Sequence, residues 1–253
     1  MKKIFILGAL AALTLSSCDK DDSKNDSAGT ESPRRLKRMT QEEGNKTTVF
    51  NFTYDANKRL TAVRSTDNSQ YTLFSYDAGG NLTKVEELEE GFKNIFTYAY
   101  SGNVPVSGTF KNWMLHAGEP DELIEDDVLT YTVQNGQVTK IHYHMLLGDE
   151  TESYLLSYAN GNLVKAETEN SDNYIGVFTY GNKKPIVSPV SKYVLDPAGF
   201  SLLYASKNEL LSASFDFPGT WLDRSTTIQY TYDSKGYVLT SNDGDMQVRY
   251  EYE

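Results

Sequence analysis

Histidine residues give the first hint of chemistry in this sequence. His142 and His144 stand two residues apart, so they share one face of a predicted strand and could bind a metal ion together with His116 or Asp149. Such histidine pairs are more often ordinary strand residues than ligands. We therefore expect no metal site and no cofactor.

A run of carboxylates could gather Ca²⁺. The run contains Glu119, Asp121, Glu122, Glu125, Asp126 and Asp127. It lacks the Asp-x-Asp-x-Asp-Gly order of a calcium-binding loop, so a solvated acidic loop is predicted instead. The segment from Asn242 to Asp245 is predicted to be a hairpin turn for the same reason.

Catalytic motifs are missing from the sequence. It contains no Gly-x-Ser-x-Gly elbow, no phosphate-binding loop and no His-Glu-x-x-His. The 35 Asp and Glu residues offer carboxylate pairs of the kind used in glycoside hydrolysis, but nothing places two of them across a cleft. A hydrolase is thus the least favoured function, and we expect a protein that is not an enzyme.

The two tryptophans are better candidates for function. Trp113 and Trp221 lie in or beside segments that break the strand pattern. Aromatic residues in loops often mark binding sites, and sugars stack on their rings. Trp113 and Trp221 are therefore the candidate ligand-binding residues; the alternative, which residue type alone favours, is that each seals the core beneath its segment.

The N-terminus carries the marks of a targeting segment. Two lysines precede an apolar run over residues 4–15, which is too short to span a membrane and predicts a signal peptide over residues 1–17. The run ends in Leu-Ser-Ser-Cys18, which resembles a bacterial lipoprotein box and implies that lipid on Cys18 anchors the chain to the membrane. Because Cys18 is the single cysteine, internal disulfides and thiol nucleophiles are excluded.

Residues 18–32 predict a disordered acidic tether, since they contain no large apolar side chain. The acidic run at residues 19–22 resembles the surface-export signal of Bacteroidetes lipoproteins, which implies an outer-membrane lipoprotein at the cell surface. The alternative is a lipoprotein that faces the periplasm. Removing the signal peptide takes the net charge from −11 to −13, and this acidic balance argues against a nucleic-acid partner.

Residues 33–253 are predicted to form a single β domain built from repeats. The unit is an aromatic strand ending in Tyr, a turn rich in Gly, Asn and Asp, and a strand that opens on an aliphatic residue. Clear copies span residues 49–60, 73–82, 155–163 and 228–238, and weaker copies follow Tyr98, Tyr131 and Tyr180. Tyr54, Tyr76 and Tyr98 are spaced by 22 residues, the length of one hairpin with its turns.

Each turn is followed by two aliphatic residues at an offset of three, such as Leu60 with Val63 and Leu82 with Val85. In a regular strand an odd offset places the two residues on opposite faces. The recurrence therefore indicates either two buried faces or a β-bulge after each turn.

The fold class predicted is all-β and mainly antiparallel. Roughly 14 strands joined by hairpins exceed the number that an open twisted sheet usually holds, so a long up-and-down meander should curl into a barrel or half-barrel. Insertions are expected at residues 111–126 and 185–223. The second contains a predicted short helix near 197–206, with Asp196 as its N-cap and Pro197 in its first turn, which either plugs the barrel or forms a lid over a pocket.

The Tyr-Asp pairs at residues 54–55, 76–77 and 232–233 resemble YD (RHS-type) repeats. The chain as a whole resembles a family of Bacteroidetes lipoproteins of unknown function with a porin-like fold, which implies no activity and no site residues. Charged residues on both faces of the predicted strands, and a mean hydropathy of −0.51, favour a barrel that does not span the membrane.

The function expected from the sequence is therefore a lipid-anchored cell-envelope β-protein that binds glycans or peptides without catalysis. The alternative is a structural or assembly partner at the outer membrane. The expected partners are the membrane, through Cys18, and a glycan or a protein.

Overall fold

The computed structural model describes residues 34–170, 173–197 and 199–253. The predicted signal peptide over residues 1–17, Cys18 and the tether over residues 18–32 lie outside these ranges. The described residues form one sheet of 17 strands and one short helix, α1 (Ser201–Tyr204).

The strands follow one another along the chain as hairpins. The first nine are β1 (Leu36–Glu43), β2 (Lys46–Tyr54), β3 (Leu60–Ser65), β4 (Tyr71–Tyr76), β5 (Leu82–Glu89), β6 (Phe92–Ser101), β7 (Val104–Met114), β8 (Glu122–Gln134) and β9 (Gln137–Met145). The other eight are β10 (Glu150–Ala159), β11 (Asn162–Thr168), β12 (Ile175–Tyr180), β13 (Leu210–Asp216), β14 (Arg224–Thr227), β15 (Gln229–Tyr232), β16 (Val238–Asn242) and β17 (Met246–Tyr252).

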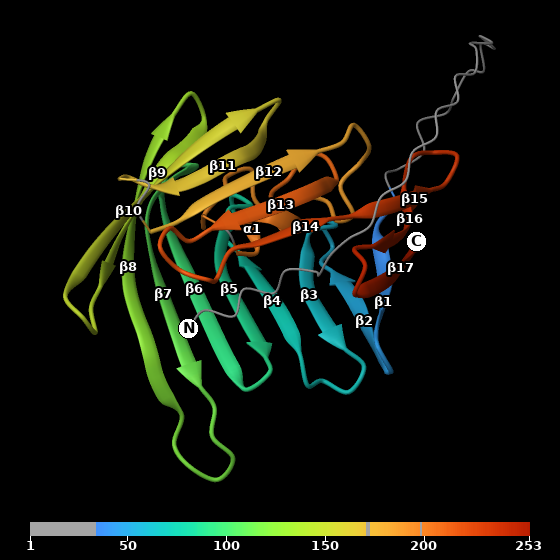
Figure 1. The fold of residues 1–253 in the computed structure, drawn as a ribbon, viewed down its shortest axis with the longest axis horizontal. Coiled ribbons are helices and arrows are strands. Elements are labelled where there is room, and N and C mark those ends of the chain that lie inside the picture. The colour runs from blue at the N-terminus through green and yellow to red at the C-terminus, as the bar shows by residue number, and fades with distance from the viewer. Residues whose placement is uncertain (1–33, 171–172, 198) are drawn as a thin grey trace.

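The sheet curls into a nearly closed barrel (Figure 1). β1 pairs with both β2 and β17, which brings the two ends of the meander together. β14 and β15 are successive parts of one segment on either side of Ile228: β13 pairs with β14, and β16 pairs with β15. The predicted antiparallel, up-and-down barrel is confirmed.

A β-bulge after each turn accounts for the aliphatic pairs at an offset of three. Thr53 faces Ala62 while Tyr54 faces Leu60, so Thr61 is the extra residue, and its hydroxyl donates a hydrogen bond of 3.0 Å to the Thr53 carbonyl oxygen. The bulge turns both Leu60 and Val63 into the core, where they are buried. Of the two explanations left open by the sequence, the bulge is correct.

The insertion after β12 fills the barrel. The Phe200 ring lies 5.8 Å from the Phe96 ring and the Tyr204 ring lies 5.1 Å from the Phe74 ring, both in edge contacts. Leu195 is fully buried, and its carbonyl oxygen accepts a hydrogen bond of 3.0 Å from Tyr131. The insertion is therefore a plug that completes the core, not a lid over an empty lumen.

The structure changes the predicted boundaries of the second insertion. Residues 181–209 leave the sheet, whereas residues 210–216 belong to β13. One short helix is present as predicted, but it covers only Ser201–Tyr204 of the expected 197–206. The Asp196 carboxylate accepts hydrogen bonds from the backbone N–H groups of Gly199 and Ser201, and thus holds a turn that precedes the helix.

The segment 111–126 stays in the sheet. β7 continues to Met114 and β8 begins at Glu122, so only residues 115–121 form a loop. Figure 1 shows this hairpin reaching beyond its neighbours. The polar and charged residues of this segment lie on the long strands β7 and β8. They interrupt the alternation of apolar residues, and this is why the sequence predicts an insertion here.

Candidate functional site

The barrel wall opens where β11 and β12 separate. The two strands pair only between Lys165–Glu167 and Ile175–Val177. Nearer the plug, residues 162–164 and 178–180 no longer face each other across a ladder, although β10 and β13 still support them from the other side. The result is a gap in the wall that is bordered by two strand edges.

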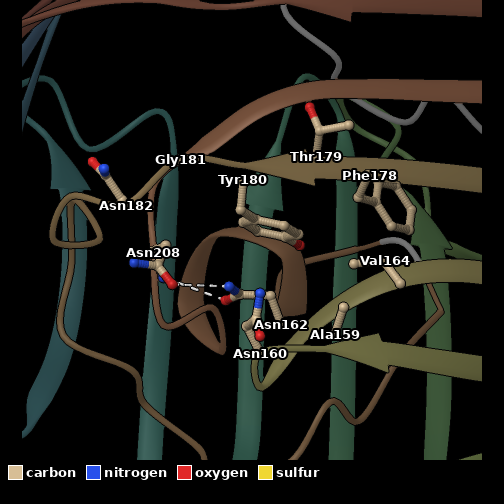
Figure 2. Close-up of a pocket in the computed structure, with 10 residues that line it drawn as sticks. All are labelled: Ala159, Asn160, Asn162, Val164, Phe178, Thr179, Tyr180, Gly181, Asn182 and Asn208. Carbon is tan, nitrogen blue, oxygen red and sulfur yellow. Dashed lines mark hydrogen bonds between the residues drawn. The ribbon is translucent and has the colours of Figure 1, made fainter.

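A pocket of about 490 Å³ lies at this gap. Its lining comes from the β10–β11 turn, from β11 and β12, and from both ends of the plug (Figure 2). The lining residues are Ala159, Asn160, Asn162, Val164, Phe178, Thr179, Tyr180, Gly181, Asn182 and Asn208. Four of them are asparagines and none carries a charged side chain.

Two of the asparagines hold the pocket together. Asn162 is buried; its amide nitrogen donates a hydrogen bond of 2.9 Å to the Asn208 side-chain oxygen, and its own oxygen accepts one of 2.7 Å from the Lys207 backbone N–H. Asn208 in turn donates a hydrogen bond of 3.0 Å to the Lys183 carbonyl oxygen. These bonds fasten the plug to the start of β11.

The other two asparagines are available to a ligand. Asn160 and Asn182 are exposed. Within the described ranges, no side-chain hydrogen bond occupies either amide. Each amide presents two donor hydrogens and one acceptor oxygen, so both can exchange hydrogen bonds with hydroxyl groups.

Tyr180 supplies an aromatic surface beside the amides. In the view of Figure 2 its ring lies above Asn162. Burial raises the pKa of Tyr180 to about 12, so the phenol is neutral throughout the physiological range. Phe178 is fully buried and closes the apolar side of the pocket. A neutral hollow with one ring and several amides is suited to an uncharged polar ligand.

The structure does not bring the two predicted binding residues together. Trp113 is half-buried on β7, opposite Lys93 and Leu123, and alternation from the buried Phe110 places it on the outer face of the barrel. Trp221 lies in the loop between β13 and β14 and is 88% exposed, so it seals no core. Both lie toward the end of the barrel opposite the gap, and neither lines the pocket.

The three histidines have separate neighbours. His142 Nδ1 lies 3.0 Å from the Ser153 hydroxyl, His144 Nε2 lies 3.0 Å from Asp149 Oδ1, and His116 Nε2 lies 3.5 Å from Glu122 Oε2. Over the part of the chain that the structure describes, no group of three or more His, Cys, Asp and Glu residues could hold a metal ion. Among the described residues, no helix is long and apolar enough to cross a membrane.

Acidic side chains also reach the inner wall. Register places Glu87, Asn94, Asn112 and Glu125 in one row across β5–β8. Burial, with the charges of Asp196 and Glu89, raises the pKa of Glu87 to about 7. Two amides separate the carboxylates by three strand spacings, roughly 14 Å. This exceeds the separation of about 5–9.5 Å used in glycoside hydrolysis.

No pattern in the sequence indicates the pocket. It placed residues 160–162 in a hairpin turn, where Asn and Gly serve the backbone equally well. Asn182 and Asn208 flank the insertion, and their nearness to Asn162 depends on how the plug crosses the barrel. The two tryptophans are conspicuous because they are rare, whereas Tyr180 is one of 18 tyrosines and is not distinguished from the others by residue type.

Comparisons with known proteins agree with this architecture. The family model for the RHS repeat matches residues 54–87. A porin-like protein from Bacteroides uniformis ATCC 8492 aligns over 87% of this chain and 98% of its own, with a TM-score of 0.50 and 13% identity. A porin-like protein from Bacteroides vulgatus ATCC 8482 aligns over 87% and 99%, with a TM-score of 0.53 and 11% identity. No curated protein matches the sequence. The predicted resemblance to YD repeats and to the porin-like Bacteroidetes fold is confirmed.

Proposed function

We propose that this chain is a cell-envelope β-barrel protein that binds a glycan, without catalysis, in the pocket between β11 and β12. The observation that carries the proposal is the gap in the barrel wall, where Asn160 and Asn182, whose amides are free, line the same uncharged pocket as Tyr180. The volume of about 490 Å³ lies within the usual range for small-ligand sites.

Glycan chemistry fits this lining. Sugar hydroxyls are both donors and acceptors, and an asparagine amide matches both roles at once. The apolar face of a sugar ring stacks on an aromatic side chain such as Tyr180. The absence of charged groups from the lining favours a neutral part of the ligand at this position.

A peptide is the competing ligand. The edges of β11 and β12 at the gap, residues 162–164 and 178–180, have no strand between them. An extended peptide binds such edges through backbone hydrogen bonds, with side chains entering pockets. This mode would use backbone groups and would depend little on the Asn160 and Asn182 amides. Substitution of these amides would therefore weaken the binding of a glycan but not that of a peptide.

A role in assembly at the outer membrane would use a different surface. Trp221 and Leu222 are adjacent and are 88% and 41% exposed. Exposed apolar residues of this kind often mark protein contacts. Trp221→Ala would then abolish capture of the partner while leaving the pocket intact.

The proposed location is the outer membrane, with lipid on Cys18 and the barrel at the cell surface. The sequence around Cys18, the acidic run at residues 19–22 and the porin-like Bacteroides neighbours support it. Palmitate labelling should be lost in Cys18→Ala, and protease added to intact cells should digest the wild-type protein. Protection of the protein until the outer membrane is opened would place it in the periplasm.

The binding proposal is tested with the purified full chain in detergent, screened on a glycan array and on a peptide library. The best ligand is then titrated against the wild type and against Asn160→Gly and Asn182→Ala. One lost hydrogen bond weakens binding by roughly 2- to 12-fold. Asn68→Gly is the matched control, because Asn68 and Asn160 both have a positive φ, 59° and 53°, which glycine accommodates. Unchanged affinity in both pocket variants would contradict the proposal.

A further inference from the structure

We propose that the bound glycan carries a carboxylate, as in a uronic acid, and that Lys192 and Lys207 bind this carboxylate in a second pocket adjoining the first. The inference rests on the proposed function and adds the chemical class of the ligand.

The second pocket lies across the β10–β11 turn from the first. Its volume is about 320 Å³. Its lining residues are Asn135, Gly136, Gln137, Tyr158, Gly161, Lys192, Tyr193, Val194, Ala205 and Lys207. Asn160 and Asn162 line the first pocket, whereas Gly161 between them lines the second. Likewise Asn208 lines the first pocket and its neighbour Lys207 lines the second. A ligand that extends around this turn therefore reaches both pockets.

Lys207 is held at the boundary between the pockets. A Cβ atom at Gly161 would collide with the end of the Lys207 side chain, so the ammonium group lies directly against the turn. The Lys207 backbone N–H is fixed by its hydrogen bond of 2.7 Å to Asn162. Gly161 has a φ of +81°, which glycine adopts readily, and its missing side chain makes room for the lysine.

Neither lysine of the second pocket has a carboxylate partner among the residues that the structure describes. The Lys192 ammonium lies 4.8 Å from the centre of the Tyr193 ring, and no salt bridge reaches either Lys192 or Lys207. The lining itself contains two lysines and no acidic residue. The pocket thus presents positive charge that a ligand can neutralise.

The surface of the plug around this pocket is also positively charged. Its lysines, Lys183, Lys184, Lys192 and Lys207, are all exposed. Its two acids, Asp196 and Glu209, are each 3% exposed. The Glu209 carboxylate accepts a hydrogen bond of 2.7 Å from the Lys183 backbone N–H and one of 3.1 Å from the Tyr232 hydroxyl. On a chain of net charge −11, this is a local positive surface around the pocket.

The test uses ligands that differ only in charge. An array carries oligogalacturonates with free carboxylates, the same oligosaccharides as methyl esters, and further acidic and neutral pairs. The wild-type chain is compared with the double variant Lys192→Gln/Lys207→Gln. The matched control is Lys183→Gln/Lys184→Gln, which removes the same charge from the same insertion but from residues outside both pockets.

We expect the wild type to bind the acidic member of a pair at least about tenfold more tightly than the neutral member at low salt, with the difference shrinking as salt is added. Lys192→Gln/Lys207→Gln should remove this difference and leave neutral binding unchanged, whereas the control variant should keep it. A wild type that binds both members equally overturns the inference and leaves the proposed function standing.

The remaining outcomes are also decisive. Acidic binding that depends on Lys192 and Lys207, without any neutral binding, supports the carboxylate site and overturns the neutral-pocket proposal. Equal losses in the two double variants, or equal binding of both to vesicles of anionic lipid, would show attraction to the whole plug surface and overturn the site. Binding of neither ligand class overturns both proposals.

Discussion

The hydroxyl of Tyr76 donates a hydrogen bond of 2.7 Å to the carbonyl oxygen of Leu60, the residue that opens the strand after the preceding turn. The same link joins other hairpins, through Tyr54 to Leu36, Tyr100 to Leu82, Tyr158 to Val138 and Tyr230 to Leu210, at 2.7–2.8 Å. Each of these tyrosines therefore ties its own hairpin to an earlier one. The repeated Tyr stabilises the barrel rather than forming a site.

The Asp of each Tyr-Asp pair closes its own turn. Asp77 accepts hydrogen bonds of 2.8 and 2.9 Å from the backbone and side-chain nitrogens of Asn81, and Asp55 accepts from the backbone of Asn57 and Arg59. These bonds hold the pKa of both carboxyls below its ordinary value. In these two pairs the motif thus joins neighbouring hairpins through Tyr and fixes the turn through Asp, whereas in the third pair Tyr232 donates its hydrogen bond to the Glu209 carboxylate.

The first prediction concerns the tyrosine link. Tyr76→Phe leaves the Leu60 carbonyl without its donor, and we expect a loss of about 1 kcal/mol in the free energy of unfolding, or a Tm lower by roughly 2–4 °C. Tyr98→Phe is the matched control, because the buried Tyr98 hydroxyl has no hydrogen-bond partner in the structure. Thermal unfolding followed by circular dichroism gives both values. Equal losses in the two variants would show that the link does not stabilise the barrel.

The second prediction concerns the plug. The Phe200 ring packs between the barrel walls, 5.8 Å from Phe96 and 6.4 Å from Tyr98. Phe200→Ala should therefore lower the free energy of unfolding by about 3–5 kcal/mol. Leu203→Ala, in the same segment but 47% exposed, should cost far less. Denaturant unfolding measures both, and similar small losses would place the plug outside the core.

The third prediction is a pH dependence caused by Glu87. Its pKa is raised from 4.5 to about 7, so between these values the folded chain keeps a proton that the unfolded chain releases. Stability must then fall as pH rises through this window. Glu87→Gln should flatten the profile and exceed the wild type at pH 8. Glu89, whose pKa is also raised to about 7, retains part of the slope.

This profile is read from Tm values at several pH values between 4 and 8. Glu119→Gln is the control, since Glu119 is exposed in the loop after β7. It should follow the wild-type curve. A Glu87→Gln profile parallel to the wild type would refute a proton held by this carboxyl.

The fourth prediction compares two glycines that have similar backbones. Gly161 and Gly91 have φ values of +81° and +84°, so alanine strains each by about 1 kcal/mol. Gly91 lines neither pocket, and a Cβ atom there meets nothing within 4 Å, whereas one at Gly161 displaces the Lys207 side chain. We expect similar losses of Tm, but weaker binding of acidic glycans only in Gly161→Ala. Equal affinities would show that Lys207 needs no fixed position.

The sequence predicted the barrel because its repeat encodes local structure. Tyr, turn and aliphatic residues recur at hairpin spacing, and each copy folds in the same way. The repeat pattern misassigns two residues, however: Tyr232 ends the last clear copy, whereas Tyr230 makes the link there. Spacing of 22 selected Tyr98, whereas the linking role belongs to Tyr100, which lies at the bulge opposite Pro105. Both side chains point inward, and alternation alone cannot distinguish them.

The pocket was beyond prediction from the sequence for a physical reason. Asn162 and Asn208 are 46 residues apart and meet because the plug returns to the wall beside β11. The separation of β11 from β12 leaves no mark on the repeat, since both strands keep their usual pattern. Trp113 and Trp221 stand out by residue type alone, which says nothing about what surrounds a side chain.

The central claim is that the pocket between β11 and β12 binds a glycan. Its most direct test is calorimetric titration of the array-selected glycan into the wild type and into the double variant Asn160→Gly/Asn182→Ala. We predict that the double variant keeps the wild-type Tm and binds at least about tenfold more weakly. Wild-type affinity in the double variant, or no glycan bound by the wild type, would contradict the claim.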